Sequence, residues 1–267
     1  TRQGIMQHRV NDLEIHFELS GPEDADVVTF SHAFMADSTM WDRQLKALDS
    51  FRCLRYDIRG HGKSEATEGS YDLNLLAMDL LGLLDHLQIE STHFVGSSLG
   101  AMIGLELAFA SPERLASLTL CNTRGNCTTT HAETRREWME SVQSGGVQSI
   151  SDSILPTWFS KKFLSKSIDD VERAKSMIEA TSTLGYLGCT QAMEGQDHSP
   201  RLSEIKLPSL IVVGEDDPTT PLQEAFDLHV GIDGSDMVVI PKARHLATME
   251  ASTEFNDVLA TFLKQYS

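Results

Sequence analysis

Short apolar runs alternate along this chain with longer segments in which apolar residues recur at every third or fourth position. The short runs predict buried strands at residues 27–31, 51–56, 93–95, 115–120, 209–213 and 237–240. The longer segments predict helices at residues 40–48, 73–87, 99–110 and 223–229, and from residue 253 onward. Alternation of this kind is typical of an α/β fold with a mostly parallel sheet.

The first twenty residues follow a different pattern. Residues 5–10 and 13–19 both have the character of strands, and Asn11 and Asp12 between them form a turn-prone pair. We therefore expect an N-terminal antiparallel hairpin, which brings the predicted sheet to eight strands. In the helix predicted at 73–87, Asp72, Asp79 and Asp85 lie off the apolar stripe and are expected to face solvent.

The segment at residues 122–202 contains no convincing strand. It is rich in Thr, Ser and charged residues, and helix-like stretches occur at 132–143 and 169–181. We interpret it as an all-helical cap, or lid, inserted into the α/β unit. The predicted core domain is then formed by residues 1–121 and 203–267.

The chain has 267 residues and a strong excess of acid, since 22 Lys and Arg face 39 Asp and Glu, for a net charge of −17. This balance argues against nucleic acid and against anionic membrane surfaces, both of which require a basic face. We interpret the acid excess mainly as an aid to solubility. The most apolar stretch is interrupted by Asp79 and Asp85, so no membrane span is expected. The first ten residues contain no apolar run of the kind found in signal peptides.

Cysteine and histidine spacing argues against metal and disulfide chemistry. The four cysteines, Cys53, Cys121, Cys127 and Cys189, form no C-x-x-C pair, and a reducing, cytoplasmic compartment is the resulting expectation. No two histidines have metal-ligand spacing, and no G-x-G-x-x-G or P-loop pattern follows a predicted strand. We therefore expect neither a metal nor a cofactor.

A candidate nucleophile lies in the segment Gly96-Ser97-Ser98-Leu99-Gly100, which is the only G-x-S-x-G in the chain. A predicted strand precedes it and a predicted helix follows it, which is the strand–turn–helix context of a nucleophile elbow. The glycines two residues to either side of Ser98 leave room where a Cβ would collide with the neighbouring strand and helix. The alternative is that Ser98 only caps an ordinary strand-to-helix turn.

Serine requires a base, and the base requires a group that orients it. The order Ser, Asp, His is expected along the chain for an elbow of this type. Two carboxylates, Asp216 and Asp217, follow the strand at 209–213, and we interpret Asp216 as a solvated turn residue. His245 lies in a loop after the strand at 237–240, at the same edge of the sheet.

Several segments together resemble the α/β-hydrolase superfamily. They are Ser31-His32-Ala33-Phe34, Met40-Trp41-Asp42, the loop at 55–64, the elbow, the loop at 214–221 and the loop around His245. Within the superfamily, the pattern is most similar to the 3-oxoadipate enol-lactonase type. Two features of the insertion carry that resemblance, namely the Trp158-Phe159 pair and the segment Gly185-Tyr186-Leu187-Gly188-Cys189 with Ala192 and Asp197-His198.

The resemblance implies a cofactor-free serine hydrolase acting on a small-molecule ester or lactone. Ser98 would be the nucleophile and His245 the general base and then acid. Asp217 would be the orienting carboxylate, because the acid of this family stands third after the glycine, here Gly214. The oxyanion hole would be formed by the backbone N–H groups of Phe34 and Leu99.

The same resemblance suggests Met35 and Trp158 as residues of the substrate pocket, although Trp158 is equally compatible with a packing role. Thr157 stands where the enol-lactonase pattern has an Arg, and Arg124, Arg135 and Arg136 are other cations of the insertion. An enol-lactone is the best candidate substrate, followed by small-acyl esters and acyl-lactones, with C–C bond hydrolysis a third possibility. The alternative from another class is a small-molecule receptor that keeps the hydrolase fold.

Overall fold

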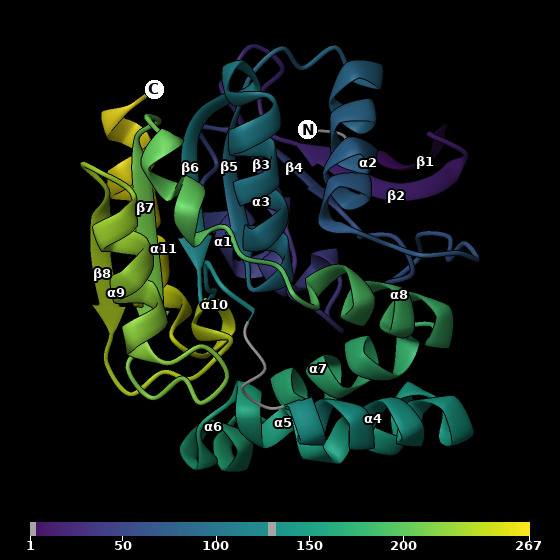
Figure 1. The fold of residues 1–267 in the computed structure, drawn as a ribbon. Helices are drawn as coiled ribbons and strands as arrows, with labels where there is room; N and C mark the ends of the chain where they lie inside the picture. The colour runs from purple at the N-terminus through teal and green to yellow at the C-terminus, as the bar shows by residue number, and fades with distance from the viewer. Residues whose placement is uncertain (1–3, 128–131) are drawn as a thin grey trace.

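A twisted eight-stranded sheet runs through the molecule, with helices on both of its faces (Figure 1). The structure is a computed structural model that describes residues 4–127 and 132–267. The strands are β1 (Gly4–Val10), β2 (Leu13–Ser20), β3 (Val27–Ser31), β4 (Arg52–Tyr56), β5 (Thr92–Ser97), β6 (Leu115–Cys121), β7 (Ser209–Gly214) and β8 (Asp236–Ile240). Their order in the sheet is β1-β2-β4-β3-β5-β6-β7-β8.

The sheet is mostly parallel. Strand β2 pairs antiparallel with both β1 and β4, and all the other neighbours are parallel. The predicted fold class, with its N-terminal hairpin and mostly parallel sheet, is therefore confirmed. Because the parallel strands end at one edge, the loops that follow β3, β5, β7 and β8 gather there.

Two groups of helices flank the sheet. On one face lie α2 (Leu73–His86), α3 (Leu99–Ala110) and α9 (Leu222–Gly231), and on the other lie α1 (Asp42–Ala47) and α11 (Ser252–Gln265) (Figure 1). The short elements η1 (Ser38–Trp41), η2 (Pro112–Arg114) and α10 (Ala247–Glu250) lie in connections. Each face of the sheet buries its own apolar cluster, and most residues of α3 are buried.

A helical insert between β6 and β7 lies over the carboxyl edge of the strands (Figure 1). It consists of α4 (Ala132–Gly145), η3 (Val147–Ile150), α5 (Ser151–Trp158), α6 (Lys161–Lys166), α7 (Ile168–Ala180), α8 (Thr183–Met193) and η4 (Ser199–Glu204). No strand occurs in the described part of this insert. Two of its helices match the helix-like stretches of the sequence, whereas α5, α6 and α8 are absent from that prediction. Helices α5 and α6 are short, and α8 contains Gly185 and Gly188. The boundaries of a separate cap domain stay a prediction.

Ion pairs join the insert to the rest of the protein. Asp170 of α7 accepts from Arg43 of α1 at 2.6 Å, and Arg173 of α7 donates to Asp42 at 2.7 Å. Asp42 also binds the buried Arg55 of β4. These ion pairs connect α7 of the insert to α1 and β4.

The prediction that Asp79 faces solvent is wrong. Its side chain is buried and accepts two hydrogen bonds from Arg59, at 2.7 Å from Nε and 2.6 Å from Nη2. Asp72 instead caps the start of α2 by accepting from the N–H of Leu75, and the Asp85 side chain is exposed. Helical periodicity alone does not reveal Asp79, because its partner comes from the loop after β4.

Two histidines, His32 and His61, are buried near the carboxyl edge of the strands. His32 Nε2 accepts the N–H of Ile58 at 2.8 Å, so the proton sits on Nδ1, which donates to the carbonyl of Ala33. The ring of His61 lies 5.3 Å from that of His32 and 5.7 Å from that of Phe34. Burial, and then the neighbouring His32, lower the pKa of His61 to about 3. Burial also lowers the pKa of His32, so both imidazoles are neutral at physiological pH.

None of the four cysteines, all within the described residues, forms a disulfide. Burial raises the pKa of the Cys53 thiol to about 12, and it also raises the pKa of Cys121 and Cys189. In the described ranges, every helix is too short or too polar to cross a lipid bilayer. The cytoplasmic location stays a prediction.

We predict that Asp79→Ala lowers the free energy of unfolding by about 3–5 kcal/mol, because it leaves the buried Arg59 guanidinium without a counter-charge. Asp85→Ala is the matched control on the same helix. Asp85 also pairs with an arginine, Arg114, but its side chain is 67% exposed, so the cost should stay below about 1 kcal/mol. Urea denaturation measures both. Equal losses in the two variants would contradict the burial argument.

A second prediction concerns acid stability. Between pH 6.5, the ordinary pKa of histidine, and about 3, the unfolded chain binds a proton that the folded His61 does not. Stability is therefore lost as the pH falls, with a slope of up to about 1.4 kcal/mol per pH unit from this group. His61→Asn keeps a donor for the Arg59 carbonyl and should make the dependence shallower. Urea midpoints at pH 7 and pH 5 test this, and parallel slopes in the two proteins would refute it.

Candidate active site

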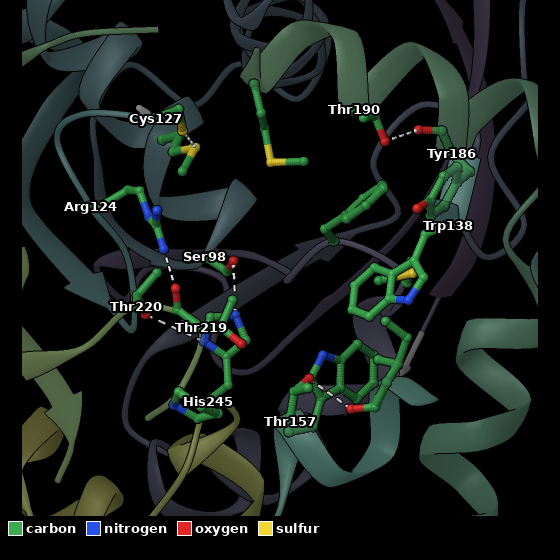
Figure 2. Close-up of a pocket in the computed structure, with 17 residues that line it drawn as sticks. Ser98, Arg124, Cys127, Trp138, Thr157, Tyr186, Thr190, Thr219, Thr220 and His245 are labelled. Atoms are coloured by element: carbon green, nitrogen blue, oxygen red, sulfur yellow. Dashed lines mark hydrogen bonds between the residues drawn. The ribbon is translucent and has the colours of Figure 1, made fainter. Parts of the chain in front are cut away.

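The backbone at Ser98 adopts a conformation that L-residues rarely use. Its φ is 52° and its ψ is −113°, at the junction between β5 and α3. A Cβ on Gly96 would lie 2.5 Å from the carbonyl oxygen of Gly100, and a Cβ on Gly100 would lie 2.2 Å from that of Ser31. Only glycine at both positions permits this close packing of strand ends against the first turn of α3. The turn directs the Ser98 side chain out of the sheet edge, as Figure 2 shows.

Three loops from distant parts of the chain bring Ser98, His245 and Asp217 together. His245 Nε2 lies 3.0 Å from Ser98 Oγ, and His245 Nδ1 lies 2.9 Å from Asp217 Oδ2. Ser98 follows β5, Asp217 follows β7 and His245 follows β8. All three side chains are buried. The geometry permits a proton to pass from the hydroxyl to the imidazole while the carboxylate orients the ring.

Asp217 is held as an anion by its surroundings. The N–H groups of Thr219 and Thr220 donate to Oδ1 at 2.8 and 3.0 Å, and the Thr220 hydroxyl and the Asn122 amide donate to Oδ2 at 2.6 and 2.8 Å. Burial alone would raise the pKa of Asp217, but the charge of His245 and the hydrogen bonds from His245 and Thr220 together hold this pKa far below its usual range.

Asp216, the neighbouring carboxylate, is exposed, in keeping with its interpretation as a solvated turn residue.

Backbone hydrogen bonds attach the His245 loop to the insert. Leu246 N–H donates to the carbonyl of Trp158 at 3.1 Å. Glu250 accepts the N–H of Arg244 on Oε2 at 2.9 Å and the N–H of Ser160 on Oε1 at 3.0 Å. The residues on both sides of His245 are thus anchored to the end of α5. Nothing in the sequence pattern indicated this function for Glu250.

The first turn of α3 and the loop after β3 supply two backbone donors near Ser98. Leu99 N–H opens α3, and Phe34 lies in the loop whose start is packed against Gly100. Within the described residues, no protein group accepts a hydrogen bond from either N–H. Met35 follows with a φ of 62°, which turns the loop back toward η1. Leu99 and Phe34 are therefore candidates to hold a developing oxyanion.

A cavity of about 320 Å³ opens above Ser98, between the sheet edge and the insert (Figure 2). Met35 and Trp158, the two predicted pocket residues, both line it. The other lining residues are Phe34, Ser98, Met102, Arg124, Cys127, Trp138, Ile154, Thr157, Tyr186, Thr190, Met193, Pro218, Thr219, Thr220 and His245. Of the lining residues from α4, α5 and α8, Thr157, Trp158 and Tyr186 lie in segments that carry the family resemblance, whereas Trp138, Ile154, Thr190 and Met193 have no sequence signal beyond ordinary amphipathic spacing.

The three arginines considered as cations for the substrate, Arg124, Arg135 and Arg136, have different positions. Arg124 lines the cavity and is 7% exposed. Arg136 is exposed on α4, and the side chain of Arg135 lies outside what the structure describes. Thr157 also lines the cavity, and its hydroxyl donates to the carbonyl of Ile154 at 2.7 Å.

A mostly parallel eight-stranded sheet with an N-terminal antiparallel pair and a helical insert before β7 is the architecture of an α/β-hydrolase. A family model described as alpha/beta hydrolase fold matches residues 26–252. The chain belongs to this family.

The chain is similar to enol-lactonases and to an esterase. It is 32% identical over 248 residues to 3-oxoadipate enol-lactonase 1 of Acinetobacter baylyi, covering 92% of each chain. The crystal structure of the enol-lactonase from Burkholderia xenovorans LB400 superposes with a TM-score of 0.93 at 29% identity, covering 97% of this chain and 100% of the other. A thermophilic esterase from Thermogutta terrifontis gives a TM-score of 0.91 at 28% identity, covering 99% and 100%.

We predict that Glu250→Gln lowers kcat by about 10- to 100-fold while KM changes little. A glutamine oxygen accepts only one of the two N–H groups, and its NH₂ faces the other donor, so the His245 loop loosens without loss of the binding surface. Steady-state kinetics on p-nitrophenyl acetate measures the two constants separately.

Glu254→Gln, at an exposed position of α11, is the control and should behave as the unmodified protein. A rise in KM at constant kcat in Glu250→Gln would show that the residue supports the pocket rather than the histidine.

Proposed function

We propose that this protein is a serine hydrolase that cleaves a carboxylic ester or lactone through an acyl-enzyme, with no cofactor. The observation that carries the proposal is the continuous hydrogen-bonded chain from Ser98 Oγ through His245 to Asp217, buried at the floor of the cavity. A structural role alone does not account for a strained serine whose hydroxyl meets the imidazole of a histidine oriented by a carboxylate.

In the proposed mechanism, His245 Nε2 takes the proton of Ser98 as Oγ attacks the carbonyl carbon. The N–H groups of Leu99 and Phe34 hold the oxygen of the tetrahedral intermediate, and each such donor is typically worth roughly 3–4 kcal/mol. The C–O bond then breaks, and His245 returns the proton to the leaving alkoxide or enolate. A water molecule, deprotonated by His245, attacks the acyl-Ser98 and releases the carboxylic acid. Asp217 stabilises the imidazolium in both halves.

The best candidate substrate is 3-oxoadipate enol-lactone, which the relatives' names support. The cavity, at about 320 Å³, is at the lower end of the range for small-molecule sites and suits a compact substrate of this kind. A small-acyl carboxylesterase is the second candidate, and the similarity to the Thermogutta esterase favours it.

Replacing the nucleophile gives the decisive kinetic prediction. Ser98→Ala should lower kcat on p-nitrophenyl acetate and on the enol-lactone by about 10⁴-fold or more, because no other group forms the acyl intermediate. Ser97→Ala is the matched control. Ser97 is adjacent and buried, but its hydroxyl has no hydrogen-bond partner within the described residues, so activity should be retained.

Equal activity in Ser98→Ala and the unmodified protein would refute the proposed function. Binding of the enol-lactone, seen as a thermal shift without turnover, would instead favour a receptor.

A further inference from the structure

The described lining of the cavity contains basic but no acidic side chains, whereas the chain as a whole is strongly acidic. The protein carries a net charge of −17, yet no aspartate or glutamate occurs among the described residues that line the cavity. Among the lining residues that the structure describes, only Arg124 and His245 can carry a positive charge. His245 is already engaged with Ser98 and Asp217. Of the side chains that the structure describes, Arg124 is thus the one cation that faces the space above Ser98.

Arg124 is fixed close to the reacting atoms. It follows β6 by three residues, and the preceding Thr123 donates its hydroxyl to the carbonyl of Ser98 at 3.0 Å. The guanidinium donates from Nη2 to the carbonyl of Thr219, in the same loop as Asp217. Figure 2 shows Arg124 and Ser98 on the same side of the cavity, with Thr219 between Arg124 and His245.

The charge of Arg124 is incompletely compensated. A guanidinium carries five N–H donors, and here one carbonyl accepts a hydrogen bond while the nearest carboxylate, Glu224 Oε1, lies 3.8 Å from Nη1. At 7% exposure, water also satisfies little of the group. A buried cation in this state gains most from an anion that enters the cavity, and the planar guanidinium fork matches a carboxylate in two parallel hydrogen bonds.

We propose that Arg124 binds a carboxylate carried by the substrate and makes the enzyme select anionic esters or lactones over neutral ones. This inference rests on the proposed hydrolase function and adds a specificity-determining residue to it. The cation lies three residues after β6, whereas position 157 on α5 holds a threonine whose hydroxyl is bound to its own helix. Glu224 partly neutralises Arg124 when the cavity holds no anion, which makes burial of the charge tolerable.

A matched pair of lactones tests the inference. The probes are 5-oxotetrahydrofuran-2-acetic acid and its primary amide, which share the lactone and the carbon skeleton, and only the acid carries a negative charge. We expect the unmodified enzyme to prefer the acid by about 10- to 100-fold in kcat/KM, the range of a charge-assisted hydrogen-bonded pair. Arg124→Met should lower turnover of the acid much more than turnover of the amide, so that the preference is lost, and Arg124→Lys should keep part of it.

A second variant acts in the opposite direction. Glu224→Gln removes the competing carboxylate and should increase the acid-to-amide ratio. An acid-to-amide ratio near one in the unmodified enzyme, or a ratio that neither Arg124→Met nor Glu224→Gln changes, overturns the inference. Equal loss of both substrates in a folded Arg124→Met would assign Arg124 a purely structural role. In each of these cases the proposed function stands if turnover of the amide still requires Ser98.

Discussion

The arrangement of the site depends on one close approach, that of the first turn of α3 to the end of β3. Gly100 packs its backbone directly against Ser31 and His32, where any Cβ would overlap the chain. The same packing holds Ser98 at positive φ, places the Leu99 N–H at the start of the helix and sets the loop of Phe34 beside it. The positions of Ser98 and of the candidate oxyanion donors, the N–H groups of Leu99 and Phe34, therefore all depend on the backbone contacts of Gly100 with Ser31 and His32.

The rest of the site follows from the parallel sheet. Strands β7 and β8 end at the same edge as β5, so the loops that carry Asp217 and His245 reach Ser98 with short excursions. The insert then closes the cavity from above and also supports its floor. Trp158 contributes its ring to the cavity wall and its carbonyl to the His245 loop. A shift of α5 would thus alter substrate contacts and the position of the base together.

Local pattern was sufficient to predict the strands, α3 and the loops that bring Ser98, Asp217 and His245 together, because each depends on period, glycine placement and chain order. It failed for Asp79, whose burial depends on Arg59 twenty residues away in the sequence. No sequence pattern indicates the role of Glu250 either, because its carboxylate accepts hydrogen bonds from two backbone N–H groups. The sequence also could not predict that Arg124 lies in the cavity rather than on the surface, because this position depends on the path of the chain after β6. The net charge of −17 likewise does not indicate the charge of the cavity, whose described lining contains no aspartate or glutamate.

In the proposed mechanism, turnover depends on a covalent acyl intermediate at Ser98. The most direct measurement is intact-protein mass spectrometry, followed by peptide mapping, after rapid acid quenching of a reaction with p-nitrophenyl acetate. We expect an added mass of one acetyl group, located on Ser98 and missing from Ser98→Ala. Steady turnover of the ester with no acylated protein at any quench time, or an acetyl group that persists in Ser98→Ala, would contradict it.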